Sequence, residues 1–121
     1  MEAKEKLIQL LKTDVKEFNQ YRKESNHKRI DLSGADLLGA NLVNAELEGA
    51  DLSMADLYLA NLRAAKLFGA DLSKATLRRA NLVNADLSHT NLRCANLSRA
   101  KLFGVNFRQA DLSGANFCEA D

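Results

Sequence analysis

Residues 35–44 read ADLLGANLVN, which is one five-residue unit written twice: a small residue, an Asp or Asn, a Leu, and two variable residues. The unit continues in both directions, so that a Leu or Phe stands at every fifth position from Leu32 to Phe117. This makes eighteen consecutive units, sixteen with Leu and two with Phe, and fifteen of them have Ala two residues earlier. Such self-similarity at a fixed period indicates a repeat fold.

The apolar positions of the repeat are spaced alternately two and three residues apart, which matches neither an α-helix nor a regular strand. On extended backbone, two residues that are two apart point to the same side. Each unit is therefore expected to be a short strand that buries its Ala and Leu, followed by a corner of two residues that face water. All six glycines of the sequence occupy the second corner position, where turn geometry favours them.

Columns of like residues at a spacing of twenty indicate how many units make one coil. Positions 31, 51, 71 and 111 are Asp and position 91 is Asn, while positions 41, 61 and 81 are all Asn. A spacing of fifteen aligns less similar residues, such as Asp31, Glu46 and Asn61. The sequence therefore favours four units per coil, with neighbouring coils about 4.7–4.9 Å apart as in any sheet.

Runs such as Ala35-Asp36-Leu37 recur over about three quarters of the sequence. They resemble the A(D/N)LXX signature of the pentapeptide-repeat family. This resemblance implies an all-β solenoid, namely a right-handed quadrilateral β-helix with the Leu or Phe and the preceding Ala inside. We therefore expect an N-terminal amphipathic capping helix and linker at residues 1–29, and a pentapeptide-repeat β-helix of about four and a half coils at residues 30–121.

Residues 3–24 are expected to form one amphipathic helix. Leu7, Leu11, Val15 and Phe18 lie on one face of it, and Ile8 and Tyr21 lie on the flank of that face. We expect this helix to cover the first coil, because a solenoid needs a polar-faced cap to stay soluble. A membrane-surface or partner-binding helix is the alternative. The run 18–26, FNQYRKESN, also resembles the aromatic-Asn-x-aromatic-Arg helix that precedes such repeats, with Phe and Tyr where Trp is common.

The C-terminal coil leaves two alternatives open. No second capping helix follows Phe117 in this sequence. Either the bulky side chains of Phe107 and Phe117 plug the last coil, or its open face pairs with a second copy in a homodimer, with Phe117 near the contact.

No pattern in the sequence points to catalysis, a cofactor or a metal ion, and we predict that the protein is not an enzyme. His27 and His89 are isolated and expected to be solvated, and Cys94 and Cys118 are expected to be surface thiols. The aspartates at positions 31, 51, 71 and 111, which we call the Asp column, could suggest a row of cation-binding sites. However, like charges stacked at strand spacing disfavour each other, and further ligands are lacking. No nucleophile triad, phosphate loop or Cys-rich ligand spacing occurs.

The net charge, and the lack of a signal or membrane-spanning stretch, limit the kinds of partner and location that we expect. The net charge of the protein is +1, which favours neither nucleic acid nor a membrane surface. No secretory signal or membrane-spanning stretch is found. We therefore expect a cytoplasmic protein whose partner is another protein.

One side of the coil carries the best candidate for a partner-binding face. Its corners would stack an apolar cluster next to a cluster of arginines. The residues are Leu38, Tyr58, Leu59, Arg78, Arg79 and Arg99. Tyr and Arg are enriched at protein interfaces, and clustered exposed apolar side chains are more informative than scattered ones. A surface that merely varies from repeat to repeat is the alternative.

Two functions are weighed on this basis. The first is a rigid protein-binding module or spacer. The second comes from the family resemblance, since some pentapeptide-repeat proteins bind DNA gyrase as DNA mimics and confer quinolone resistance. A mimic needs a long, strongly acidic rod, whereas residues 31–121 hold nine Lys and Arg against eleven Asp and Glu, a net charge of −2. The module is therefore favoured.

Overall fold

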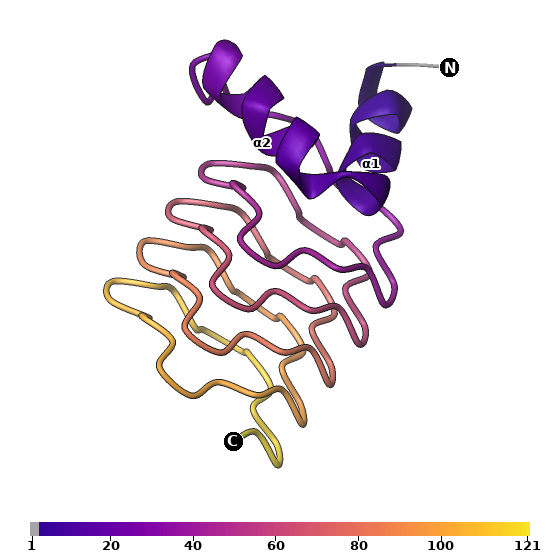
Figure 1. The fold of residues 1–121 in the computed structure, drawn as a ribbon. Helices are drawn as coiled ribbons and strands as arrows, with labels where there is room; N and C mark the ends of the chain where they lie inside the picture. Colours follow the sequence, from indigo (N-terminus) through magenta and orange to yellow (C-terminus); the bar gives the residue numbers. More distant parts are fainter. Residues whose placement is uncertain (1–2) are drawn as a thin grey trace.

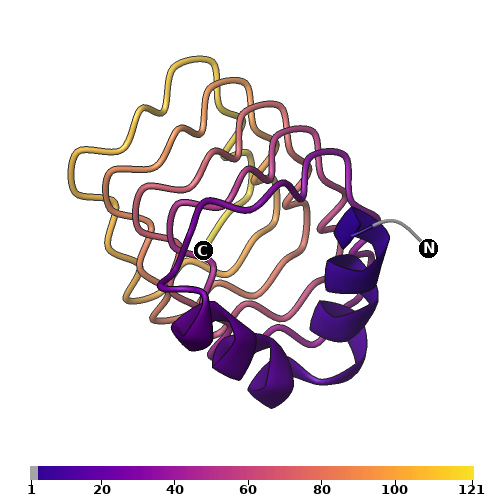
Figure 2. The same cartoon turned by 90° about the horizontal axis from the view of Figure 1, so that it is seen from above.

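The computed structural model describes residues 3–121 as two short helices over one end of a stack of coils (Figure 1). Helix α1 spans Ala3–Thr13 and helix α2 spans Val15–Glu24. From Ile30 the polypeptide winds away from the helices, and the C-terminus lies at the far end of the stack (Figure 1). Seen from above, successive coils repeat the same outline (Figure 2).

Fourteen parallel β-bridges set the size of each coil, and every one joins a residue to the residue twenty positions later, beginning with Asp31 and Asp51. One coil therefore contains four repeats, as the residue columns predicted. We number its sides from the bridging residues of the first coil: Asp31, Asp36, Asn41 and Glu46. Within residues 3–121 each side contributes a single bridging residue and no longer strand, because the corner follows directly after the Leu.

Each corner is a four-residue turn closed by a backbone hydrogen bond, such as Ala35 N–H to Leu32 C=O at 3.1 Å. The second corner residue has a positive φ in all eighteen repeats, from 57° to 75°. A positive φ confined to the third turn residue is the type II pattern, which favours Gly. Six repeats have Gly there, and twelve hold another residue in the same left-handed conformation.

The Asp or Asn that makes the bridge also holds the corner. In the first repeat, Asp31 Oδ1 accepts hydrogen bonds from the Ser33 N–H at 2.9 Å and from the Ser33 hydroxyl at 2.6 Å. The same hydrogen bond from backbone to side chain recurs down the stack, for example at Asn61 and Asn116. Such Asx turns explain why Asp and Asn fill this position. One first corner residue, Ser88, is buried rather than facing water, and its hydroxyl donates to Asp86 Oδ1 at 2.5 Å.

The core is one cluster of Leu and Ala side chains that all four sides of the coil contribute, as predicted. Every Leu of the repeat from Leu32 to Leu97 is fully buried. Leu11 and Phe18 extend this core into the helices. The last coil is less covered, since Leu112 is 37% exposed.

The prediction of one N-terminal helix is wrong, because the helix breaks at Asp14. Asp14 has φ −153°, and its carboxylate accepts a hydrogen bond from the Glu17 N–H at 3.0 Å. It is therefore the N-cap of α2, a position that Asp favours. The predicted apolar face is confirmed, since Leu11 and Phe18 are buried in the core and Leu7 and Val15 pack against it. Tyr21, on the flank, is 38% exposed, and the fully buried Arg22 was not predicted.

Candidate functional site

The N-terminal cap is built around the buried side chain of Arg22. Its Nε donates to the backbone carbonyl of Glu46 at 3.0 Å, and its two terminal nitrogens donate to the carbonyls of Glu48 and Lys28. Burial lowers the pKa of the Arg22 guanidinium, and the nearby carboxylates of Glu48 and Glu46 oppose that shift. The planar fork of Arg suits such convergent acceptors.

Asn19 completes the same cap. Its Oδ1 accepts from the Glu46 N–H at 2.8 Å, and its Nδ2 donates to the Asn44 C=O at 3.0 Å. In the coils below, the equivalent groups bond to the backbone of the preceding coil, as when the Lys66 N–H donates to Ala45 C=O. Asn19 and Arg22 therefore replace a preceding coil on the fourth side.

A buried carboxylate lies beside this cap. Glu46 is 8% exposed, with His27 Nε2 3.5 Å from one carboxylate oxygen and Lys66 Nζ 3.9 Å from the other. His27 is thus exposed but not isolated. His89 is exposed, as expected, and its ring centroid lies 5.0 Å from that of Phe68. His27 precedes the first coil and His89 lies in the third. The described residues contain no group of three or more His, Cys, Asp or Glu side chains that could hold a metal ion.

The candidate partner-binding face forms at the corners of the second side. Backbone hydrogen bonds hold its columns in register, as when the Leu59 N–H donates to Arg78 C=O at 3.1 Å. Leu38 and Leu59 are 56% and 50% exposed, so the helices leave Leu38 uncovered. Arg79 and Arg99 are also exposed, while Tyr58 and Arg78 are half-buried. We call these six residues the corner face.

Two contacts order the side chains of the corner face. The Arg78 guanidinium lies over the Tyr58 ring, 5.9 Å from its centroid, as in a cation–π pair. Arg99 Nε donates to a carboxylate oxygen of Glu119 at 2.6 Å. Arg79 has no ion pair within residues 3–121. The face therefore offers one free guanidinium beside exposed leucines.

The last coil brings the two predicted Phe residues together. The rings of Phe107 and Phe117 meet edge to face, with centroids 5.9 Å apart and planes at 86°. Both side chains are half-buried. Because these rings come from the fourth and second sides, they meet across the interior of the coil.

The comparisons with known proteins agree with this geometry. The family model for pentapeptide repeats matches residues 25–63, 65–102 and 100–121. The chain belongs to the pentapeptide-repeat family. No curated protein matches it. The matched range begins at residue 25, just after α2 and a few residues before the first bridging residue, Asp31.

Solved pentapeptide-repeat proteins include three similar structures. One from Nostoc PCC 7120 is 38% identical, with a TM-score of 0.65, over 82% of this protein and 93% of that one. One from the Arabidopsis thaliana thylakoid lumen is 35% identical, with a TM-score of 0.46, over 71% of this protein and 63% of that one. HetL, a pentapeptide-repeat protein involved in heterocyst differentiation regulation from Nostoc PCC 7120, is 33% identical, with a TM-score of 0.41, over 75% of this protein and 59% of that one.

The two cysteines of this pentapeptide-repeat protein lie on its surface, as expected. Cys94 and Cys118 are both exposed, and the Sγ of Cys94 lies against Gly114 of the next coil. Neither described helix is long and apolar enough to cross a membrane. The candidate binding surfaces of the described residues are therefore the corner face, the last coil, and the edge of the first coil that lies next to Asn19 and Arg22.

Proposed function

We propose that this protein is a right-handed four-sided β-helix that acts as a non-catalytic, rigid protein-binding module in the cytoplasm. The observation that carries the proposal is the corner face. It places exposed Leu38 and Leu59 beside the Tyr58 and Arg78 pair and the free Arg79. Apolar anchors flanked by aromatic and guanidinium groups are typical of interface hot spots.

The scaffold suits this role because it fixes the spacing of the side chains it presents. Corner residues of successive coils are held by bonds such as Arg79 N–H to Ser98 C=O at 2.9 Å. Little ordering of the backbone is therefore needed when a partner binds, which lowers the entropic cost of association. A rigid, mixed-charge surface favours a protein partner over a phosphate backbone.

A photo-cross-linking experiment tests the proposal. A photoreactive amino acid is placed at Leu59 in the corner face, and, in a control protein, at Met54, which is 67% exposed on the first side. We expect one discrete cross-linked protein species from Leu59 and none from Met54. Equal products from both positions would contradict the proposal.

A second measurement uses the triple variant Tyr58→Ala, Arg79→Ala, Arg99→Ala. None of these side chains belongs to the buried core, so the thermal midpoint should stay nearly unchanged. Capture of the cross-linked partner by the variant should fall at least tenfold. Capture that survives this change but is lost in Asp51→Ala, Asp71→Ala would place the interface on the Asp column instead.

The DNA-mimic alternative lacks a comparable observation. The repeats carry a net charge of only −2, and the corner face presents arginines where a mimic would present carboxylates. A gyrase supercoiling assay decides the point, since a mimic inhibits supercoiling at stoichiometric concentrations and a module of the proposed kind does not.

A further inference from the structure

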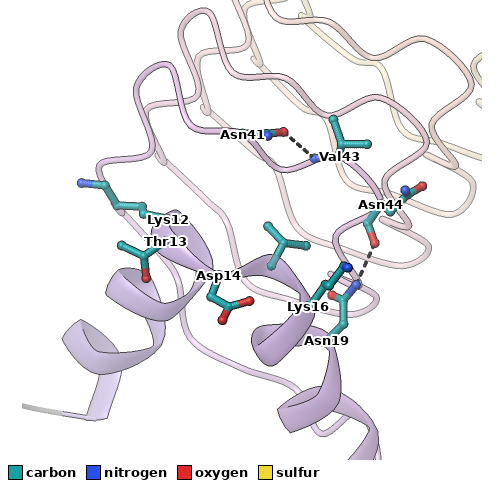
Figure 3. A pocket seen from close by; sticks show the side chains of 9 residues that line it. Lys12, Thr13, Asp14, Lys16, Asn19, Asn41, Val43 and Asn44 are labelled. Carbon is teal, nitrogen blue, oxygen red and sulfur yellow. Dashed lines mark hydrogen bonds between the residues drawn. The ribbon is translucent and has the colours of Figure 1, made fainter.

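A groove of about 500 Å³ lies where α1 gives way to α2, against the third side of the first coil (Figure 3). The helices and the coil both contribute to its walls. Its main lining residues are Lys12, Val15, Lys16, Asn41, Val43 and Asn44. The helices therefore leave this stretch of the coil edge open, although they cover the neighbouring fourth side.

The open edge carries backbone groups that are paired in every later coil. In the second coil, the Asn61 N–H donates to Ala40 C=O at 2.9 Å, and the Asn61 C=O accepts from the Leu42 N–H at 2.7 Å. The corresponding groups of the first coil are the N–H and C=O of Asn41 and the C=O of Val43. Within residues 3–121 no hydrogen bond from backbone or side chains reaches them.

The contrast with the fourth side shows how such groups are satisfied in this molecule. There the same array, the N–H and C=O of Glu46 and the C=O of Glu48, is bonded by Asn19 and Arg22. Asn19 also closes the end of the groove through its bond to Asn44 C=O (Figure 3). One side of the first coil is thus capped by the protein itself, and the next is left as an unpaired edge.

We propose that this groove binds an extended acidic segment of a partner protein, which adds to the first coil as a strand. The N–H groups of the segment donate to the Asn41 and Val43 C=O groups, and one of its carbonyls accepts from the Asn41 N–H. This is β-strand addition, in which backbone hydrogen bonds provide affinity and contacts of the side chains provide specificity. The site is separate from the corner face and does not depend on it.

The side chains around the groove select the acidic character of the segment. Lys12 and Lys16 are exposed at its rim. Asp14 also lines it, with its carboxylate bonded to the Glu17 N–H as the N-cap of α2. With both lysines, the lining still carries a net positive charge of one. The start of α2 adds a partial positive charge at the same place. Val15 and Val43 are half-buried and offer a small apolar contact between the charged groups.

The test is a titration of the full-length protein with three capped nonapeptides, followed by amide NMR signals. The first alternates glutamate and threonine, the second alternates lysine and threonine, and the third is the glutamate peptide with alternate backbone nitrogens methylated. We expect the glutamate peptide to shift the amide signals of Asn41 and Asn44 and to slow hydrogen exchange at Asn41. The lysine and methylated peptides should bind at least tenfold more weakly.

Charge-reversal variants separate the groove from general attraction. The double variant Lys12→Glu, Lys16→Glu should bind the glutamate peptide at least tenfold more weakly and the lysine peptide more tightly. The control Lys74→Glu, Lys101→Glu changes the net charge equally, far from the groove, and should leave binding within twofold. No binding at millimolar peptide, equal binding of the methylated peptide, or shifts centred on Arg78 and Arg79 would each overturn the proposal.

Discussion

The Nε of Arg22 in α2 donates to the backbone carbonyl of Glu46 in the first coil, over 3.0 Å. This bond joins the helical cap to the edge of the β-helix, and two further bonds of the same guanidinium reinforce it. Arg22 is fully buried, so water cannot simply replace the lost donors if the side chain is removed. The cap therefore depends on polar contacts as well as on the apolar face of the helices.

Replacing Arg22 by Ala is expected to lower the free energy of unfolding by roughly 3 kcal/mol, because it leaves buried acceptors without a donor. Arg22→Lys keeps the charge but not the planar fork. Its free energy of unfolding should lie between those of the wild type and Arg22→Ala. Arg29→Ala is the matched control, since Arg29 also donates to a carbonyl, that of Gly49, but is exposed. It should cost under about 1 kcal/mol. Denaturant unfolding measures all three, and equal losses in Arg22→Ala and Arg29→Ala would contradict this account.

The sequence predicted the coil well because each repeat is determined locally. Five residues contain the bridge, the buried Leu, the corner and the next Ala, so the pattern around Leu37 holds almost unchanged at Leu97. The cap could not be derived in this way, since two of the three partners of Arg22 lie 24 and 26 residues away. The resemblance of residues 18–22 to the lead helix of the family was the only signal for it.

The Gly104 position is expected to tolerate a side chain less well than the Gly69 position. Both have a left-handed backbone, with φ of 75° and 69°, which costs an L-residue roughly 1–2 kcal/mol. A Cβ at Gly104 would also lie 2.2 Å from Asn84 Oδ1, whereas one at Gly69 would meet nothing within 4 Å. Gly104→Ala should therefore destabilise the fold by about 1 kcal/mol more than Gly69→Ala, because the Asn84 side chain must leave its rotamer.

A double variant checks the cause of this difference. With Asn84→Ala in place, no side-chain oxygen lies above Gly104, and the added cost of Gly104→Ala should shrink to that of Gly69→Ala. Thermal unfolding of the four proteins of the cycle gives the coupling energy. A coupling near zero would show that backbone strain alone sets the cost.

The Asx turns at the two ends of the Asp column predict a dependence of stability on acid. The Ser113 hydroxyl and N–H, and more weakly Arg93, hold the pKa of Asp111 below its usual range, and Ser33 with Lys4 does the same for the pKa of Asp31. A carboxyl whose pKa is lower in the folded state stabilises the fold above its unfolded pKa, about 3.9. That contribution is lost as the pH falls through the lower, folded value.

Asp31→Asn, Asp111→Asn should therefore flatten the loss of stability as the pH falls below about 4, because an amide oxygen keeps the turn but does not titrate. Unfolding by denaturant at a series of pH values measures the slope. Asp36→Asn serves as the control, since Asp36 accepts only the Leu38 N–H, at 3.3 Å, and has no Ser hydroxyl. A slope unchanged in the double variant would mean that other groups govern the acid response.

The corner face shows what the sequence can and cannot supply about a site. Stacking at a spacing of twenty placed Tyr58 and Arg78 in one column, and the structure brings them within 5.9 Å. The pairing of Arg99 with Glu119 and the freedom of Arg79 depend on rotamers, which the repeat does not determine. Whether a partner uses this face stays a prediction.

The last coil exposes both unpaired backbone donors and unpaired backbone acceptors at its open edge. Within residues 3–121 the N–H groups of Leu112 and Phe117 and the C=O groups of Ala110 and Ala115 have no hydrogen-bond partner. An edge with alternating donors and acceptors is self-complementary about a two-fold axis. Leu112, 37% exposed, and the half-buried Phe117 add apolar area to the same end.

We therefore predict that this protein forms a homodimer through its last coil, with Phe117 near the contact. Phe117→Asp should shift the species seen by analytical ultracentrifugation from dimer to monomer at high micromolar concentration, because it places a charge in a desolvated contact. Phe103→Asp is the control: Phe103 belongs to the same coil and is 79% exposed, but it lies at an outward corner. It should leave the dimer intact. A wild-type protein that sediments as a monomer would favour the alternative, in which the edge-to-face contact of Phe107 and Phe117 closes the coil by itself.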